Sequence, residues 1–244
     1  FNPSDPISLG LAAFYLLNEG KDSTVYNLVN PSLNPGTFSG HSGALPFWAV
    51  GRTGPALETT SGTSQYVACG NLDLSTNGQL TIAGWFKPLV LNNVRPLVAQ
   101  RNTSSGFLTN YGVTLENGGQ LGFFHRIVSG GQLYHWRTSE NIVVGRWYHL
   151  AVTYINGSPA QIYINGHKAA SSQVAGSPTA PDLANDDTLQ MVIGQYGTAN
   201  DPSNAFYGQI DSVGLWRRAL SPGEIQRLAV EPYPMLVQPR PVQW

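Results

Sequence analysis

The strongest constraint on the fold lies in residues 146–168, where runs of β-branched and aromatic residues alternate with two Asn-Gly steps. These steps are Asn156-Gly157 and Asn165-Gly166. A tight hairpin turn needs positive φ, which Asn and Gly tolerate and β-branched residues do not. The pattern therefore predicts consecutive antiparallel strands in the middle of a large sheet. In the segment 161–165, Ile162 and Ile164 should lie on one face of that sheet and Tyr163 on the other.

Short runs of the same kind recur along the chain, separated by turns rich in Gly, Asn and Pro. The exception is the segment 221–224, Ser-Pro-Gly-Glu, which offers an N-cap, a proline at the first helical position and a capping-box Glu. It predicts a short helix to about Ala229. The fold class is therefore all-β, a two-sheet antiparallel jelly-roll sandwich with one short C-terminal helix.

The chain of 244 residues is long enough to bury a core as one domain without disulfides or metals. We divide it into an extended N-terminal arm (1–9), the jelly roll (10–228) and a proline-rich C-terminal tail (229–244). The net charge is −1 and the basic residues do not cluster, which argues against nucleic-acid binding. The single cysteine, Cys69, excludes an internal disulfide. We expect no membrane segment, because no run of about 18 apolar residues exists.

Motifs along residues 10–228 occur in an order typical of one family. They lie at 10–11, 17–20, 48, 54–57, 65–67, 81–86, 147–153, 163–166, 208–211 and 215–221. In this order they resemble the laminin-G-like branch of the concanavalin A-like jelly rolls. The resemblance implies two stacked antiparallel sheets, often with calcium at one rim. The family serves binding, adhesion and structural roles, so the resemblance does not choose among them.

The resemblance implies Ca²⁺ as a cofactor, with Asn27 and Asp211 as the candidate metal ligands. Where such domains often carry Asp after the first strand, this chain has Asn27. An amide oxygen can bind Ca²⁺, but without the charge the affinity should be lower. The alternative is that Asp211 accepts backbone hydrogen bonds at a strand end.

We expect no enzymatic activity. Glycoside hydrolysis, the most plausible chemistry for this architecture, needs two carboxylates about 5–9.5 Å apart. The nearest approach to such a pair is Asp182 with Asp186 and Asp187, and these residues lie in a polar loop. Phosphate-binding, dinucleotide-binding and zinc-protease motifs do not occur.

The ribbon 123–137 is the most site-like stretch of the chain. With a two-residue turn at Gly130-Gly131, one face of the ribbon carries Arg126, His135 and Arg137, and the other carries His125, Ile127, Tyr134 and Trp136. We predict that His125, Tyr134 and Trp136 form an exposed ligand or partner surface. The alternative is that these rings are the inner face of the sheet. Trp85, Trp147 and Trp216 are expected in the core.

The first functional hypothesis is a bacteriophage virion subunit, either a head-decorating or a tail-associated protein. Proline-rich arms at both ends of a non-catalytic jelly roll suit docking on other virion proteins and on copies of the same chain. Residues 231–236 with 239–241 also resemble the tails of laminin-G-like phage structural proteins. The residues expected to bury in neighbouring subunits are Tyr233, Met235, Leu236 and Trp244.

The second hypothesis is a carbohydrate-binding or adhesin module of a secreted protein, with a glycan as partner and an extracellular location. It predicts an exposed aromatic platform and a tail without a docking partner. A third hypothesis is a hydrolase relative that has lost its carboxylates.

Overall fold

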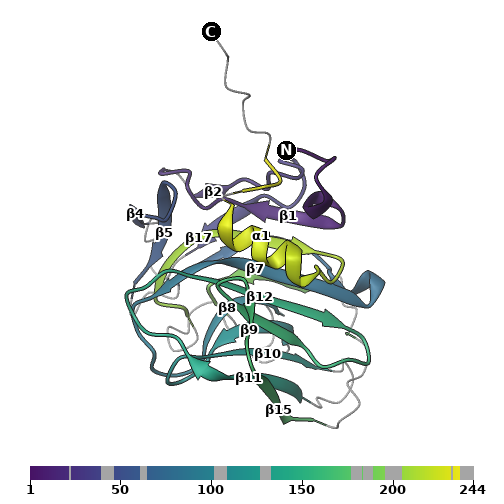
Figure 1. The fold of residues 1–244 in the computed structure, drawn as a ribbon. Helices are drawn as coiled ribbons and strands as arrows, with labels where there is room; N and C mark the ends of the chain where they lie inside the picture. Colours follow the sequence, from purple (N-terminus) through teal and green to yellow (C-terminus); the bar gives the residue numbers. More distant parts are fainter. Residues whose placement is uncertain are drawn as a thin grey trace.

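The computed structural model describes residues 1–21, 23–39, 47–60, 65–101, 109–126, 133–176, 183, 189–195, 205–231 and 233–236. These residues form two antiparallel sheets stacked on each other, with a helix and both terminal segments on the far side of one sheet (Figure 1). The expected jelly-roll sandwich with a short C-terminal helix is confirmed. No helix in these ranges is long and apolar enough to span a bilayer.

The first sheet has eight strands and lies directly beneath the helix (Figure 1). Strand β1 (Leu11–Tyr15) pairs with β17 outside the main path. The main path runs β14 (His167–Lys168), β13 (Gln161–Ile164), β12 (Tyr148–Ile155), β7 (Gln79–Pro88), β17 (Gly208–Trp216), β5 (Pro55–Thr59) and β4 (Phe47–Val50).

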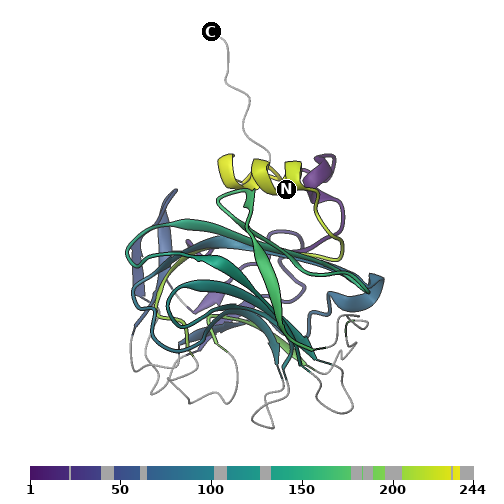
Figure 2. The ribbon, with the colours of Figure 1, turned by 60° about the horizontal axis from the view of Figure 1, so that its bottom comes forward.

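The second sheet has nine strands, and Figure 2 turns it toward the viewer. Two short 3₁₀ helices, η1 (Pro6–Ser8) and η3 (Ser75–Asn77), lie outside both sheets. The strand order is β15 (Ser171–Ala175), β11 (Leu133–Asn141), β10 (Gln120–Arg126), β9 (Thr109–Leu115), β8 (Arg95–Arg101), β16 (Gln190–Ile193), β6 (Tyr66–Ala68), β3 (Gly36–Ser39) and β2 (Thr24–Val25).

The segment that constrained the fold forms strands β12, β13 and β14, paired in series. At the turn between β13 and β14, Asn165 and Gly166 have φ of 52° and 83°, the conformation that only such residues adopt readily. Ile162 belongs to the cluster between the sheets, and Tyr163 belongs to a second cluster on the outer face. The predicted alternation along this strand is confirmed.

A second apolar cluster covers the outer face of the first sheet. All nine residues of β17 are buried, so both faces of this strand are covered. The outer cluster joins sheet residues to the helix α1 (Pro222–Val230) and to both terminal segments. Its buried members are Ile7, Leu11, Phe14, Ala83, Ala151, Tyr163, Trp216, Leu220, Ile225, Leu228 and Met235. The molecule therefore has three layers rather than two.

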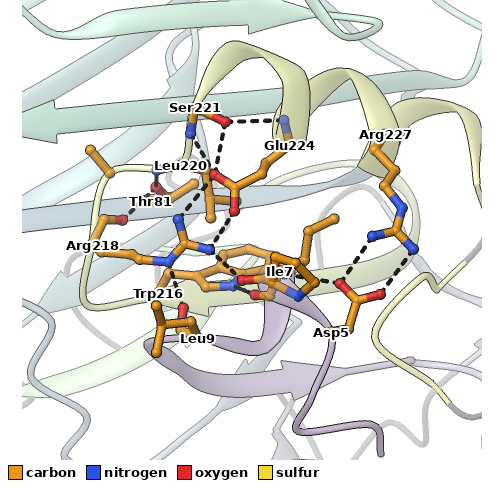
Figure 3. A network of polar contacts seen from close by, with 12 residues as sticks. Asp5, Ile7, Leu9, Thr81, Trp216, Arg218, Leu220, Ser221, Glu224 and Arg227 are labelled. Carbon is orange, nitrogen blue, oxygen red and sulfur yellow. Dashed lines mark hydrogen bonds and ion pairs between the residues drawn. The ribbon is translucent and has the colours of Figure 1, made fainter.

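Polar contacts hold this third layer in place (Figure 3). The Arg218 guanidinium donates to the carbonyl oxygens of Leu9 at 2.6 Å and Pro6 at 2.8 Å, and both of its terminal nitrogens bind the Glu224 carboxylate. The hydrogen bonds from Arg218 lower the pKa of Glu224 to about 2. The predicted capping box between Ser221 and Glu224 is present. One arginine thus connects the N-terminal segment to the start of the helix.

The N-terminal segment is not simply extended. Asp5 caps the 3₁₀ helix η1 and receives two hydrogen bonds from the Arg227 guanidinium of α1 at 2.9 and 3.0 Å. The indole N–H of Trp216 donates to the carbonyl oxygen of Ile7 at 2.7 Å (Figure 3). Residues 1–9 are therefore part of the folded body.

The C-terminal tail corrects the expectation of a free assembly arm. Met235 is fully buried in the outer cluster, and its carbonyl oxygen accepts a hydrogen bond from the Asn2 amide at 2.7 Å. The Tyr233 hydroxyl donates to Asp211 at 2.8 Å, and Leu236 packs against the same cluster. These side chains are used within their own chain because burying them stabilises it more than exposing them would. Trp244 lies outside the described residues. The helix ends at Val230, two residues beyond the expected boundary between jelly roll and tail at residue 228.

Truncation of Met235 should destabilise the protein. Met235→Ala removes a fully buried side chain from the outer cluster, and we expect a loss of about 2–4 kcal/mol in the free energy of unfolding. Val230→Ala is the matched control, because Val230 is 69% exposed and its truncation should change stability by less than about 0.5 kcal/mol. Denaturant titrations of both variants measure the difference. Equal stabilities would mean that the tail does not pack in solution.

Candidate functional site

The three rings predicted as an exposed surface lie inside the sandwich. His125, Tyr134 and Trp136 are 0%, 4% and 2% exposed, and the His125 ring stacks on Tyr134 with ring centres 5.1 Å apart. On the paired strands His125 lies opposite Tyr134, whereas a two-residue turn at 130–131 would place it opposite Trp136. The shift is two residues, so each side chain keeps its predicted face. The prediction of an exposed aromatic face is therefore wrong, and the alternative of an inner face is correct. The turn at residues 130–131 and Ile127 lie outside the described residues.

Trp136 still lines a surface pocket of about 430 Å³. The pocket lies where the chain passes from β14 of the first sheet to β15 of the second. The three tryptophans predicted in the core differ in burial: Trp216 is fully buried, whereas Trp85 and Trp147 are only partly buried. The Trp85 ring lies under the Arg52 guanidinium at 3.8 Å.

The candidate calcium ligands are both occupied by protein donors. Asn27 accepts hydrogen bonds from two backbone amides and donates to the Leu33 carbonyl oxygen. Asp211, which is 1% exposed, accepts from the backbone amides of Arg52 and Thr53 and from the hydroxyls of Thr53 and Tyr233. Calcium needs six to eight oxygen ligands, and donor hydrogens face these oxygens instead. The two residues do not fit a calcium site.

Within the described ranges, no three His, Cys, Asp or Glu side chains form a group that would hold a metal ion. Calcium binding by the chain as a whole stays a prediction. The acidic loop residues Asp182, Asp186 and Asp187 lie outside the described residues.

The more promising site is the outer face of the second sheet, opposite the helix (Figures 1 and 2). On β10 and β11, Phe124 is paired with His135, and Gly122 with Arg137. Since paired residues share a face, these side chains project away from the core, together with Arg126. We call this set, with Thr114 and Glu116, the outer-face cluster. The predicted common face of Arg126, His135 and Arg137 is confirmed by the register.

A buried carboxylate lies at the base of the outer-face cluster. The side chain of Glu116 is 2% exposed and accepts a hydrogen bond from the Thr114 hydroxyl at 2.6 Å. His135 Nε2 and Arg137 Nε lie 3.3 and 3.2 Å from its two oxygens. These two contacts have ion-pair distances but not hydrogen-bond angles. A Cβ at Gly122 would lie 2.6 Å from the carboxylate, so glycine leaves the room for it.

The environment keeps Glu116 ionised. Burial alone would raise the pKa of this carboxyl, but the contacts with His135 and Thr114 and the charge of Arg137 outweigh it. The net effect is a pKa below the usual value. A general acid needs a raised pKa, so Glu116 is suited to holding Arg137 in position rather than to donating a proton.

The outer-face cluster can recognise a flat polar ligand. The Phe124 ring lies over Gly112 of the adjacent strand, where a Cβ would come within 3.0 Å of the ring. Phe124 is partly exposed and meets the His135 ring edge-to-face at 6.4 Å. The Arg137 side chain is 38% exposed, and its guanidinium offers further N–H donors. An apolar ring surface beside fixed donors suits a ring-shaped ligand that carries oxygens.

Sequence reasoning overlooked Phe124 and Glu116 as site residues. The available signal was charge: a face with two arginines cannot be the dry inner face unless both are paired. That argument assigns Arg126, His135 and Arg137 to the outside, and Phe124 follows from the alternation.

Comparison with known proteins identifies the family. A sequence profile of the concanavalin A-like lectin/glucanases superfamily matches residues 61–226. The chain belongs to this superfamily. The expected resemblance to concanavalin A-like jelly rolls is thereby confirmed. No curated protein matches the chain significantly.

Solved structures of the same fold come from several proteins. Domain 4 of an extracellular arabinanase from Geobacillus stearothermophilus, solved in complex with arabinotriose, is 23% identical with a TM-score of 0.67, covering 90% of this chain and 98% of that domain. The binding domain of Paraclostridial Mosquitocidal Protein 1 is 18% identical with a TM-score of 0.67 and covers 91% of this chain and 52% of that one. Trypanosoma rangeli sialidase, in complex with the inhibitor DANA, is 14% identical with a TM-score of 0.61, over 92% of this chain and 33% of the sialidase. At these identities the likeness establishes the fold.

Removing the charge of Glu116 should change the pH dependence of stability. The pKa of Glu116 is lowered in the folded state. The ionised side chain therefore contributes to the free energy of unfolding above pH 4.5, the pKa of Glu in the unfolded chain, and this contribution is lost as the pH falls below that value. Glu116→Gln should therefore be less stable than the parent at pH 7, with the difference shrinking below pH 4.5. Urea titrations across pH 3–7 measure this. Glu140→Gln, at an exposed position, is the control.

Acid should also destabilise the protein through His125. Burial lowers the pKa of His125 from 6.5 to about 4, and neither ring nitrogen has a hydrogen-bond partner. The unfolded chain then binds more protons between pH 6.5 and 4, so stability falls by about 3 kcal/mol as pH falls through this window. His125→Phe should remove this part of the pH dependence of stability. Thermal unfolding at several pH values measures the effect. His167→Gln, at an exposed position, should behave like the parent protein.

Proposed function

We propose that the chain is a non-catalytic carbohydrate-binding module of an extracellular protein. The observation that carries the proposal is the outer-face cluster, where a partly exposed Phe124 ring lies beside arginines on the sheet face that the helix leaves uncovered. Membership of a superfamily of lectins and glucanases supports the proposal. So does the likeness to an arabinanase domain solved in complex with arabinotriose.

The absence of catalysis is part of this proposal. Glycoside hydrolysis needs one carboxyl with a raised pKa and a second carboxylate across the scissile bond. Glu116 has a lowered pKa and holds its charge in contacts with His135 and Arg137. These properties favour a positioning role for Glu116.

The bacteriophage virion hypothesis gains no support from the comparisons. Its main argument was that Met235 and its neighbours bury in adjacent subunits, whereas Met235 is fully buried in its own chain.

A glycan array probed with the labelled whole chain tests the proposal. The array should hold neutral and acidic oligosaccharides, arabinotriose among them. We expect selective retention of at least one glycan. Absence of binding to every glycan, with a folded protein, would contradict the proposed function.

Phe124→Ala should weaken binding of the retained glycan about tenfold, because it removes the apolar contact surface of the cluster. Val50→Ala is the matched control. Val50 is 87% exposed on the β4–β5 hairpin of the other sheet, so its truncation should leave affinity unchanged. Calorimetric titration measures both variants. Equal affinities of F124A and the parent would move the binding site away from the outer face.

A further inference from the structure

The outer-face cluster carries more positive charge than a neutral sugar requires. We propose that it selects acidic sugars, whose carboxylates are bound by Arg126 and Arg137 on either side of the Phe124 ring. The inference rests on the proposed function and names the substrate class of the same surface.

The charges of the cluster are unequal. Arg126 and Arg137 are permanent cations, and within the described ranges the carboxylate of Glu116 is the one acidic group that pairs with either of them. Glu116 pairs with Arg137 and His135, and no described residue forms an ion pair with Arg126. The Nε of Arg126 is buried without an acceptor. A buried donor on a charged group without a partner costs free energy, and an anionic ligand beside it reduces that cost.

Arg137 is prepared for the same ligand. Its Nε contacts the Glu116 carboxylate at 3.2 Å, which fixes the guanidinium and leaves the terminal nitrogens for another acceptor. Planar guanidinium groups bind carboxylates through two parallel hydrogen bonds. A fixed arginine loses less conformational entropy on binding than a mobile one.

The register places the ring between the two charges. Arg126 follows Phe124 by two residues on β10, and Arg137 follows its partner His135 by two residues on β11. Because the strands are antiparallel, the two arginines lie on opposite sides of the Phe124–His135 pair. A sugar ring over Phe124 therefore lies close to both cations, and a neutral ring would leave Arg126 without an anionic partner.

A pair of probes that differ only in charge tests the inference. Trigalacturonic acid and its fully methyl-esterified form are titrated into the whole chain by calorimetry at low and high salt. We expect the acid to bind at least tenfold more tightly than the ester at low salt, with the preference reduced by salt screening. Arg126→Gln should reduce the preference about tenfold, since it removes a charge-assisted contact without leaving a buried acid unpaired.

Arg137→Gln alone leaves the Glu116 carboxylate without its arginine, so the double variant E116Q/R137Q serves as the second test. It should also lose the preference. Arg146→Gln, at an exposed position before β12, is the control and should retain it. Equal binding of acid and ester, or a preference unchanged in R126Q, overturns the inference and leaves the proposed function intact. Array binding restricted to neutral glycans would also overturn the inference alone. Absence of binding to any glycan would overturn both the inference and the proposed function.

Discussion

Burial of both faces of the first sheet is the constraint on which the rest of the structure depends. Strand β17 has no exposed residue, and small residues on the outer side of the sheet let the third layer approach closely: Ala83 on β7, Ala151 on β12 and Gly214 on β17. Arg218 then fixes that layer by binding the N-terminal segment and the helix at once. Since the helix and the described terminal residues occupy this face, the outer face of the second sheet is the broad sheet face that no other described element covers (Figure 1).

Local chemistry made much of the fold predictable. The Asn165-Gly166 turn and the capping box at Ser221 depend on backbone conformations that few residues adopt, so their sequence signals are specific. Alternation sorted the residues of β10 and β11 onto two faces correctly. It did not say which face is the inner one, because both faces carry aromatic rings and a histidine. That choice depends on the tertiary partners of the sheet, here the stacking of His125 on Tyr134 and the exclusion of Arg126 from the core.

The tail shows a different limit. Prolines disfavour helices and central strands, and the described residues 233–236 form a turn. Prolines carry no information on whether the side chains of such a segment pack. Tyr233 and Met235 dock because distant residues prepare places for them: Asp211 and Thr53 bind the tyrosine hydroxyl, and the outer cluster accepts the methionine. Asp211 is therefore a structural acceptor that joins the β4–β5 hairpin to the tail. The alternative that Asp211 accepts backbone hydrogen bonds describes its environment.

The outer-face cluster combines features that disfavour stability in a sheet. Gly112 and Gly122 weaken their strands, and Glu116 is a charge buried on the solvent side. Such features are expected where a protein places function above stability. The glycines let the Phe124 ring and the carboxylate lie close to the sheet, and the carboxylate holds Arg137 in one orientation. A site that is ordered before its ligand arrives loses less entropy on binding, and the paired strands β9, β10 and β11 supply that order.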